Sequence, residues 1–146
     1  MKLFFLALAL ASSVFAFPLQ AQAPLFTVSG TITVHQEGVI KIKLLNEAAY
    51  AAENAGRTPY EQLIPVGPKE LKQKSVSFSI KDVAKDTYCI VCFLDTNGNG
   101  KMDRGIFGPK EPIAFIKKQD RLLGKPRFED LAFLVDKPLA DIAIEL

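Results

Sequence analysis

Residues 87 to 94 read TYCIVCFL, a run of β-branched, aromatic and apolar side chains without a charge. Such a composition is typical of a strand that is buried on both faces. Cys89 and Cys92 lie three positions apart, so on a strand their side chains point to opposite faces and their Cα atoms are ~10 Å apart. A disulfide needs a Cα separation below about 7 Å. The sequence therefore predicts a central strand with two buried, unpaired thiols, and disfavours a redox C-x-x-C site.

Alternating apolar and polar residues on both sides of this run predict further strands. We expect strands at 26–34, 39–45, 75–80, 87–94, 128–135 and 141–146, with 61–66 as an edge segment. The turn at 36–38 favours a hairpin between the first two strands. Asn46 is expected to cap a short helix that ends near Gly56. Turn signals about every ten residues indicate an all-β fold, an antiparallel β-sandwich of about seven strands with one short helix.

The first residues have the pattern of an export signal. Lys2 is followed by an apolar run, Leu3 to Ala11, that is too short to span a bilayer. Ala21-Gln22-Ala23 has the A-x-A form, although proline would then be the first mature residue, and cleavage after Ala16 is the alternative. We expect a signal peptide at 1–23, a single domain at 24–146, and a periplasmic or secreted protein.

Composition argues against several classes of function. The net charge is +2, and without Lys2, the only charged residue in positions 1–23, it is +1. Basic residues are scattered among acidic ones, so we expect no nucleic-acid partner. His35 is the only histidine, lies next to a predicted turn, and has no evident nucleophile to serve. We therefore expect no enzymatic activity and no zinc or copper site.

Residues 95 to 103, DTNGNGKMD, match the spacing of an EF-hand-type calcium loop. Such a loop takes oxygen ligands from positions 1, 3, 5, 7 and 9 and has a glycine at position 6. Those ligand positions are occupied here by Asp95, Asn97, Asn99, the carbonyl of Lys101, and Asp103. Position 12, normally a bidentate Glu, is Ile106, so a further carboxylate would come from elsewhere, with Glu111 the nearest candidate. The low ligand charge predicts weak Ca²⁺ binding, with a dissociation constant on the order of 10⁻⁴–10⁻³ M.

The same stretch has a simpler interpretation. Asn-Gly occurs twice, and Asn-Gly is the favoured sequence of a tight hairpin turn. The Asn and Asp side chains could then bond only to their own backbone. The sequence leaves the metal loop and the plain turn as alternatives.

The segment from Asp95 to Arg127 is the longest irregular stretch, and its apolar residues, which include Ile106, predict that it is ordered. Aromatic and acidic side chains recur in it and just after it, which suggests a small-ligand groove as an alternative functional site, although such residues more often form a loop that packs on itself, and we expect packing for Phe115 and Phe128. The residues of that groove would be Glu111, Phe115, Phe128 and Asp130. A carrier or an enzyme built on this groove is the alternative to a non-enzymatic module.

The order of motifs also resembles a known family. Asp95-x-Asn97-x-Asn99-Gly-Lys-x-Asp103 is followed by Phe115 and then by Pro126-x-Phe128-x-Asp130-x-Ala-Phe. This run is similar to that of small exported bacterial proteins grouped as a domain of unknown function. The resemblance implies a β-sandwich of the immunoglobulin or transthyretin type and export to the periplasm or medium. It implies no activity, so we expect a binding or structural module of the cell envelope, with a homodimer or protein partner through an edge strand as one way to act.

Overall fold

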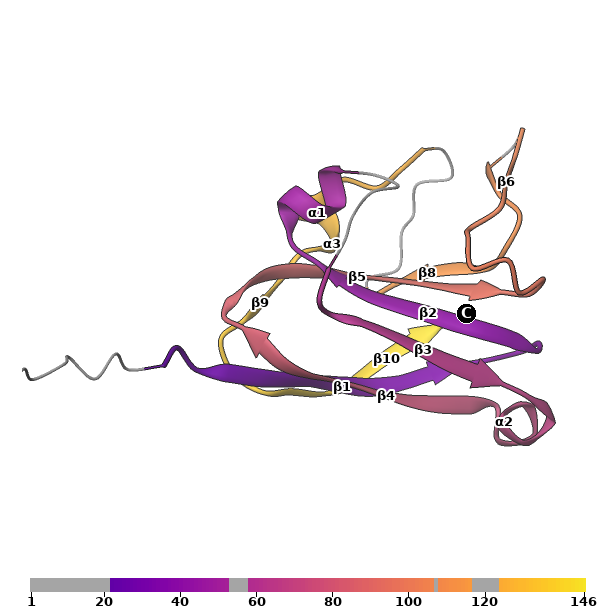
Figure 1. The fold of residues 1–146 in the computed structure, drawn as a ribbon, viewed down its shortest axis with the longest axis horizontal. Coiled ribbons are helices and arrows are strands. Elements are labelled where there is room, and N and C mark those ends of the chain that lie inside the picture. The colour runs from indigo at the N-terminus through magenta and orange to yellow at the C-terminus, as the bar shows by residue number, and fades with distance from the viewer. Residues whose placement is uncertain (1–21, 53–57, 107, 117–123) are drawn as a thin grey trace, which may run out of the picture.

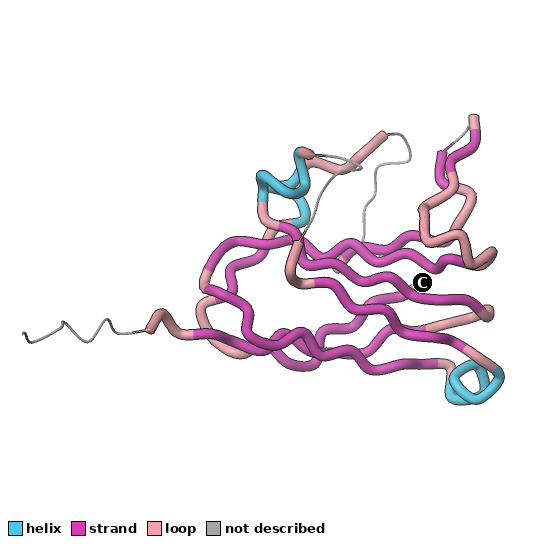
Figure 2. The backbone as a smooth tube through the Cα atoms, in the orientation of Figure 1, coloured by secondary structure: helices cyan, strands magenta, loops and turns pink. Residues whose placement is uncertain are grey.

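The structure is a computed structural model that describes residues 22–52, 58–106, 108–116 and 124–146. Most of the predicted signal peptide and the predicted end of the first helix near Gly56 lie outside these ranges. Within them the chain is mainly β-structure, with a few short helices outside the sheets (Figure 2). The helices are α1 (Glu47–Ala51), α2 (Pro68–Gln73) and α3 (Phe128–Leu131).

Two sheets lie face to face as two layers (Figure 1). The first sheet has the order β10 (Leu139–Glu145), β1 (Leu25–Thr33), β4 (Ser75–Ala84). The second has the order β3 (Glu61–Val66), β2 (Gly38–Leu45), β5 (Asp86–Asp95), β8 (Ile113–Phe115). In addition, β9 (Phe133–Val135) pairs with the start of β5, and β6 (Arg104–Gly105) pairs with β7 (Gly108–Pro109) above the second sheet. The predicted all-β sandwich is confirmed.

The core between the layers is built from the inward residues of both sheets, because side chains on a strand alternate between its faces. The first sheet contributes Val28, Ile32, Val76, Phe78, Ile80 and Ile144. The second contributes Ile40, Ile42, Leu44, Ile90, Cys92 and Leu94. Burying large aliphatic side chains of this kind stabilises a fold by about 1.5–3 kcal/mol each.

The predicted central strand is also confirmed. β5 is hydrogen-bonded to β2 along most of its length, and on its other side to β9 at one end and β8 at the other. Cys92 faces the core between the sheets, whereas Cys89 packs on the opposite face with Leu45, Tyr50 and Leu131. Both cysteines are free and fully buried. The two faces of β5 therefore have separate apolar covers.

Two predictions of strand pairing are wrong. The strands predicted to form a hairpin, β1 and β2, belong to different sheets, because each needs a buried face and the turn between them carries the chain from one layer to the other. β10 pairs with β1 in parallel, so the sandwich is not purely antiparallel. The outer strands of the described sheets are β10, β4, β3 and β8. Dimerisation through one of them stays a prediction.

Two helices replace predicted loop or strand. Residues 128–131 form α3, with acidic residues in the first turn and Leu131 buried, which suits the helix dipole and a helical apolar spacing. α2 begins with Pro68, and the Glu70 carboxylate accepts the N–H of Gly67 at 3.1 Å. Proline at the first position and Glu at the third are helix-start signals in the sequence. The apolar residues of the long loop are also less buried than expected, since Ile106 is almost fully exposed.

The parallel contact between β1 and β10 depends on Gly30. A Cβ atom at this position would overlap the carbonyl oxygen of Ile142, and the pairing register shifts between Val28 and Gly30. We predict that Gly30→Ala destabilises the protein by about 1–3 kcal/mol, the usual cost of overpacking. Urea unfolding of Gly30→Ala beside Thr31→Ala, an exposed change in the same strand, would measure it. Equal stability of Gly30→Ala and the unsubstituted protein would contradict this account of the contact.

Candidate functional site

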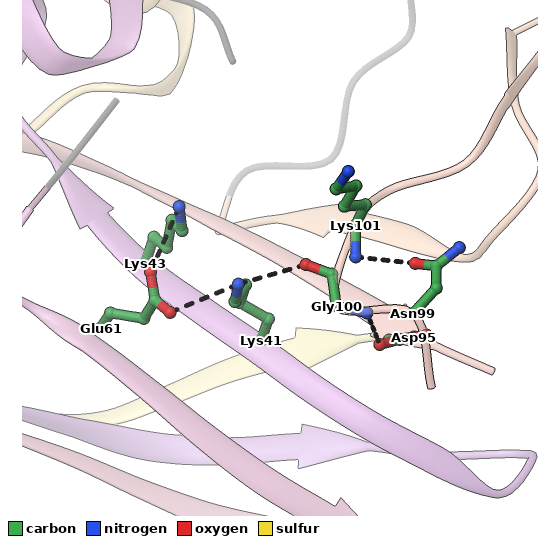
Figure 3. A network of polar contacts seen from close by, with 7 residues as sticks. All are labelled: Lys41, Lys43, Glu61, Asp95, Asn99, Gly100 and Lys101. Carbon is green, nitrogen blue, oxygen red and sulfur yellow. Dashed lines mark hydrogen bonds and ion pairs between the residues drawn. The ribbon is translucent and has the colours of Figure 1, made fainter. Parts of the chain in front are cut away.

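The candidate site is the loop 95–103, which begins where the central strand ends. The backbone carries Asp95 into the protein, so this residue is only 6% exposed. Its carboxylate oxygens accept the N–H groups of Gly98 and Gly100, each at 2.7 Å. Both glycines have φ of +74°, a left-handed conformation that glycine adopts without strain. One buried carboxylate thus curls the loop around itself (Figure 3).

The other polar residues of the loop meet at Asp103. The amide nitrogen of Asn97 donates to the Asp103 carboxylate at 2.6 Å, and that of Asn99 donates to both of its oxygens at 3.1 Å. The amide oxygen of Asn97 accepts the N–H of Asn99, and the oxygen of Asn99 accepts the N–H of Lys101. The side chains of loop positions 3, 5 and 9 therefore converge, as the spacing predicts.

Glu111 forms hydrogen bonds to both ends of the loop. It is 5% exposed, and one carboxylate oxygen accepts the N–H of Thr96 at 2.9 Å while the other accepts the N–H of Asp103 at 3.2 Å. The backbone adds a bond from Lys110 N–H to the Asp103 carbonyl at 2.8 Å. The sequence suggests Glu111 as an extra metal ligand, but its role as acceptor for two backbone N–H groups was not predicted. A buried carboxylate needs such donors.

The electrostatics of Asp95 follow from these contacts. Burial by itself raises the pKa of the carboxyl group, but the N–H groups of Gly100 and Gly98 donate to the charged form and outweigh burial. The pKa of Asp95 therefore lies below its ordinary value. The residue is ionised at neutral pH, and its negative charge is compensated by backbone dipoles.

The donor set at the loop suits a hard cation only in part. Two carboxylates, two amide oxygens and the Lys101 carbonyl are five oxygen groups, whereas Ca²⁺ takes six to eight. In the described residues, no three His, Cys, Asp or Glu side chains form a group that could hold a metal ion. Asp103 also faces the amide nitrogens of Asn97 and Asn99. For both amides to ligate a cation beside Asp103, they would turn their oxygens towards it, and water would complete the shell.

The loop lies against a charged row on the outer face of the second sheet (Figure 3). The Lys41 ammonium donates to the Gly100 carbonyl at 3.4 Å and lies 3.5 Å from the Glu61 carboxylate, which also pairs with Lys43 at 3.2 Å. A hollow of about 130 Å³ between this row and the loop is lined in part by Leu63 and Phe93. It is smaller than the ~300 Å³ at which small-molecule sites begin. A wider and more open depression is lined by β6, Ile106, β7 and Lys110.

The four residues of the predicted groove fall into separate sets of contacts. Phe115 and Phe128 pack with the apolar cluster around Tyr50, whose ring centroid lies 5.9 Å from that of Phe128. Glu111 accepts the backbone N–H groups of Thr96 and Asp103. Asp130 pairs with Arg127 on the surface of α3, at 2.9 Å between oxygen and guanidinium nitrogen. The contacts thus unite the two aromatic residues and attach the two carboxylates to different elements.

The remaining reactive groups are placed as the sequence predicts. Burial raises the pKa of the Cys89 thiol and of the Cys92 thiol to about 12. Neither thiol is therefore a thiolate nucleophile at neutral pH. His35 is exposed at the end of β1. None of the described helices is long and apolar enough to cross a membrane.

The fold and the loop together define a class: a two-layer β-sandwich that carries an Asp/Asn/Gly loop at the end of its central strand. Residues 27–143 match a family described as "Uncharacterized protein conserved in bacteria (DUF2141)". The chain belongs to this family, which confirms the resemblance inferred from its motifs. Comparisons with curated proteins and with solved structures gave no match.

Asp95 makes stability depend on pH. Its pKa is lowered by folding, so its contribution is present above the unfolded-state value of about 3.9 and is lost as pH falls through the lower, folded-state value. We predict that Asp95→Asn flattens the decline of unfolding free energy on acidification below that pH. Urea unfolding at a series of acidic pH values would measure the slope. Equal slopes for Asp95→Asn and the unsubstituted protein would refute the assignment.

Proposed function

We propose that this protein is an exported, non-catalytic β-sandwich module whose loop 95–103 binds Ca²⁺ weakly and so orders the end of the sandwich. The observation that carries the proposal is the convergence of alternate loop side chains around Asp103, above a buried and ionised Asp95. Alternate side chains converge in this way in calcium loops of the same spacing. The loop follows β5, which is paired on both sides. Ordering of the loop would therefore change the surface exposed at this end of the sandwich.

Weak affinity fits an exported protein. Two carboxylates, with two neutral amides that must reorient, favour a dissociation constant on the order of 10⁻⁴–10⁻³ M, as in extracellular modules. Calcium is available at such concentrations outside the cytoplasm. Lys2 and the apolar run that follows it support export through a cleaved signal.

A non-catalytic role is favoured by the state of the reactive groups. The thiols are buried with raised pKa values, and the single histidine is exposed. The alternative, a carrier or enzyme using Glu111, Phe115 and Asp130, receives less support, because the two carboxylates are bound to different parts of the chain. We infer that the module acts through its surface.

Thermal unfolding tests the metal loop. Metal is first removed with EDTA, and millimolar Ca²⁺ is then added. A ligand present at ten times its dissociation constant stabilises the folded protein by ~1.4 kcal/mol. For a domain of this size the melting temperature should rise by a few degrees, and by less in Mg²⁺, which demands a stricter octahedral shell. The double variant Asp95→Ala, Asp103→Ala should lose the shift, and Asp86→Ala, at the other end of β5, should keep it.

An absent shift in the unsubstituted protein, or a shift that persists in the double variant, would leave the loop as a hydrogen-bonded turn.

Export is tested by the mass of the protein recovered from a bacterium that expresses residues 1–146. We predict a processed protein in the envelope or medium, with Pro24 first after cleavage at Ala23, or Phe17 first after cleavage at Ala16. Leu8→Arg interrupts the apolar run and should leave the full-length chain in the cytoplasm. A full-length cytoplasmic product from the unsubstituted sequence would refute export.

A further inference from the structure

The candidate loop contains two Asn-Gly steps, at 97–98 and 99–100, and both glycines have φ of +74°. Asn-Gly is chemically labile, because glycine lacks the Cβ that would hinder cyclisation. The backbone nitrogen after Asn attacks the side-chain carbonyl carbon, a C–N bond forms, and ammonia leaves with the amide proton. Water then opens the resulting succinimide to Asp or to isoaspartate. The net change exchanges an amide and water for a carboxylate and ammonia, with no oxidant or other reactant.

The attacking nitrogens are the two that Asp95 holds. The N–H of Gly98 would attack Asn97 and the N–H of Gly100 would attack Asn99, and each donates to an Asp95 oxygen at 2.7 Å. A nitrogen becomes nucleophilic only as it loses its proton. A full negative charge next to that nitrogen disfavours the amide anion, and a charge-assisted hydrogen bond is stronger than a neutral one. Figure 3 shows the bond from Gly100 to Asp95.

The leaving nitrogens are the two that Asp103 holds. The side-chain amide nitrogen of Asn97 lies 2.6 Å from one Asp103 oxygen, and that of Asn99 lies 3.1 Å from both. The amide oxygens are fixed as well, by the N–H groups of Asn99 and Lys101. Each Asn side chain is therefore held at both ends, and rotation of its carbonyl carbon towards the attacking nitrogen requires several bonds to open together.

We propose that the loop 95–103 is a suppressed deamidation site, in which Asp95 restrains both attacking nitrogens and Asp103 restrains both leaving nitrogens. The two sites are coupled because they share the same two carboxylates. Opening of the loop exposes both steps at once. The proposal concerns the metal-free loop and does not depend on Ca²⁺ binding.

Modification of one step would promote modification of the other. A carboxylate at position 97 would face Asp103 at the place where an amide nitrogen now lies at 2.6 Å, and attraction would become repulsion. Isoaspartate would add a methylene group to the backbone of a loop held by bonds at alternate residues. Either product weakens the contacts that protect Asn99. The reaction is irreversible, so the modified fraction of Asn97 and Asn99 increases each time the loop opens and reacts.

The test is peptide mapping by mass spectrometry during incubation in EDTA at mildly alkaline pH. Conversion of Asn97 and Asn99 should be about tenfold or more slower in the folded protein than in the same protein unfolded in urea, since reaction requires local opening. Asp95→Ala should raise both rates together towards the unfolded value. Asp86→Ala is the matched control, because Asp86 lies in the same strand and also accepts a backbone N–H, that of Thr87 at 2.7 Å; it should change neither rate.

Gly30→Ala, a change in the opposite sheet, distinguishes the effect of a general loss of stability from the effect of losing the Asp95 hydrogen bonds. At a temperature where Gly30→Ala and Asp95→Ala are folded to the same extent, only Asp95→Ala should accelerate deamidation. Equal acceleration by both variants would overturn the proposal, and so would a folded protein that deamidates as fast as the unfolded chain. Because EDTA is present throughout, neither result depends on the outcome of the calcium test.

Discussion

The central strand β5 needs an apolar cover on both of its faces, and the rest of the structure is arranged around that need. One face is covered by the first sheet. On the other, Cys89 lies under α1 and α3, and Phe93 lies beside the loop at Gly98 and Gly100. The helices and the loop are therefore the second cover of one strand (Figure 1). Without them, Cys89 and Phe93, which are buried on this face of β5, would face water, and exposing a side chain as large as Phe costs about 1.5–3 kcal/mol.

The end of β5 poses a different problem, because the strand carries a carboxylate into a buried position. Asp95 is accommodated by backbone N–H groups that donate to its carboxylate, and Glu111 is accommodated in the same way. A loop closed by such bonds keeps its oxygens clustered and its donors engaged. That arrangement underlies both the proposed weak cation site and the proposed protection of the Asn-Gly steps. The same carboxylates would serve both properties.

Local patterns predicted the local structure well. The alternation of apolar residues predicted most of the strands, and Asn46 caps α1 as expected, with its side chain accepting the Ala49 N–H at 3.0 Å. Pairing between strands was predicted less well, since membership of a sheet depends on which distant faces need cover. The contact of Glu111 with Thr96, fifteen positions earlier in the chain, is likewise set by the folded geometry. By contrast, the start of α2 could have been predicted from Pro68 and Glu70.

The parallel pairing of β1 with β10 has a consequence for the order of folding. β1 is the first described strand and β10 the last, and the bond from Leu146 N–H to the Thr33 carbonyl closes this contact at 3.1 Å. During synthesis, one side of β1 therefore stays unpaired until residues 139–145 have left the ribosome. The chain can complete its first sheet only after translation has passed almost all of the sequence. Contacts this distant in sequence also slow folding, so the first sheet is expected to be completed late.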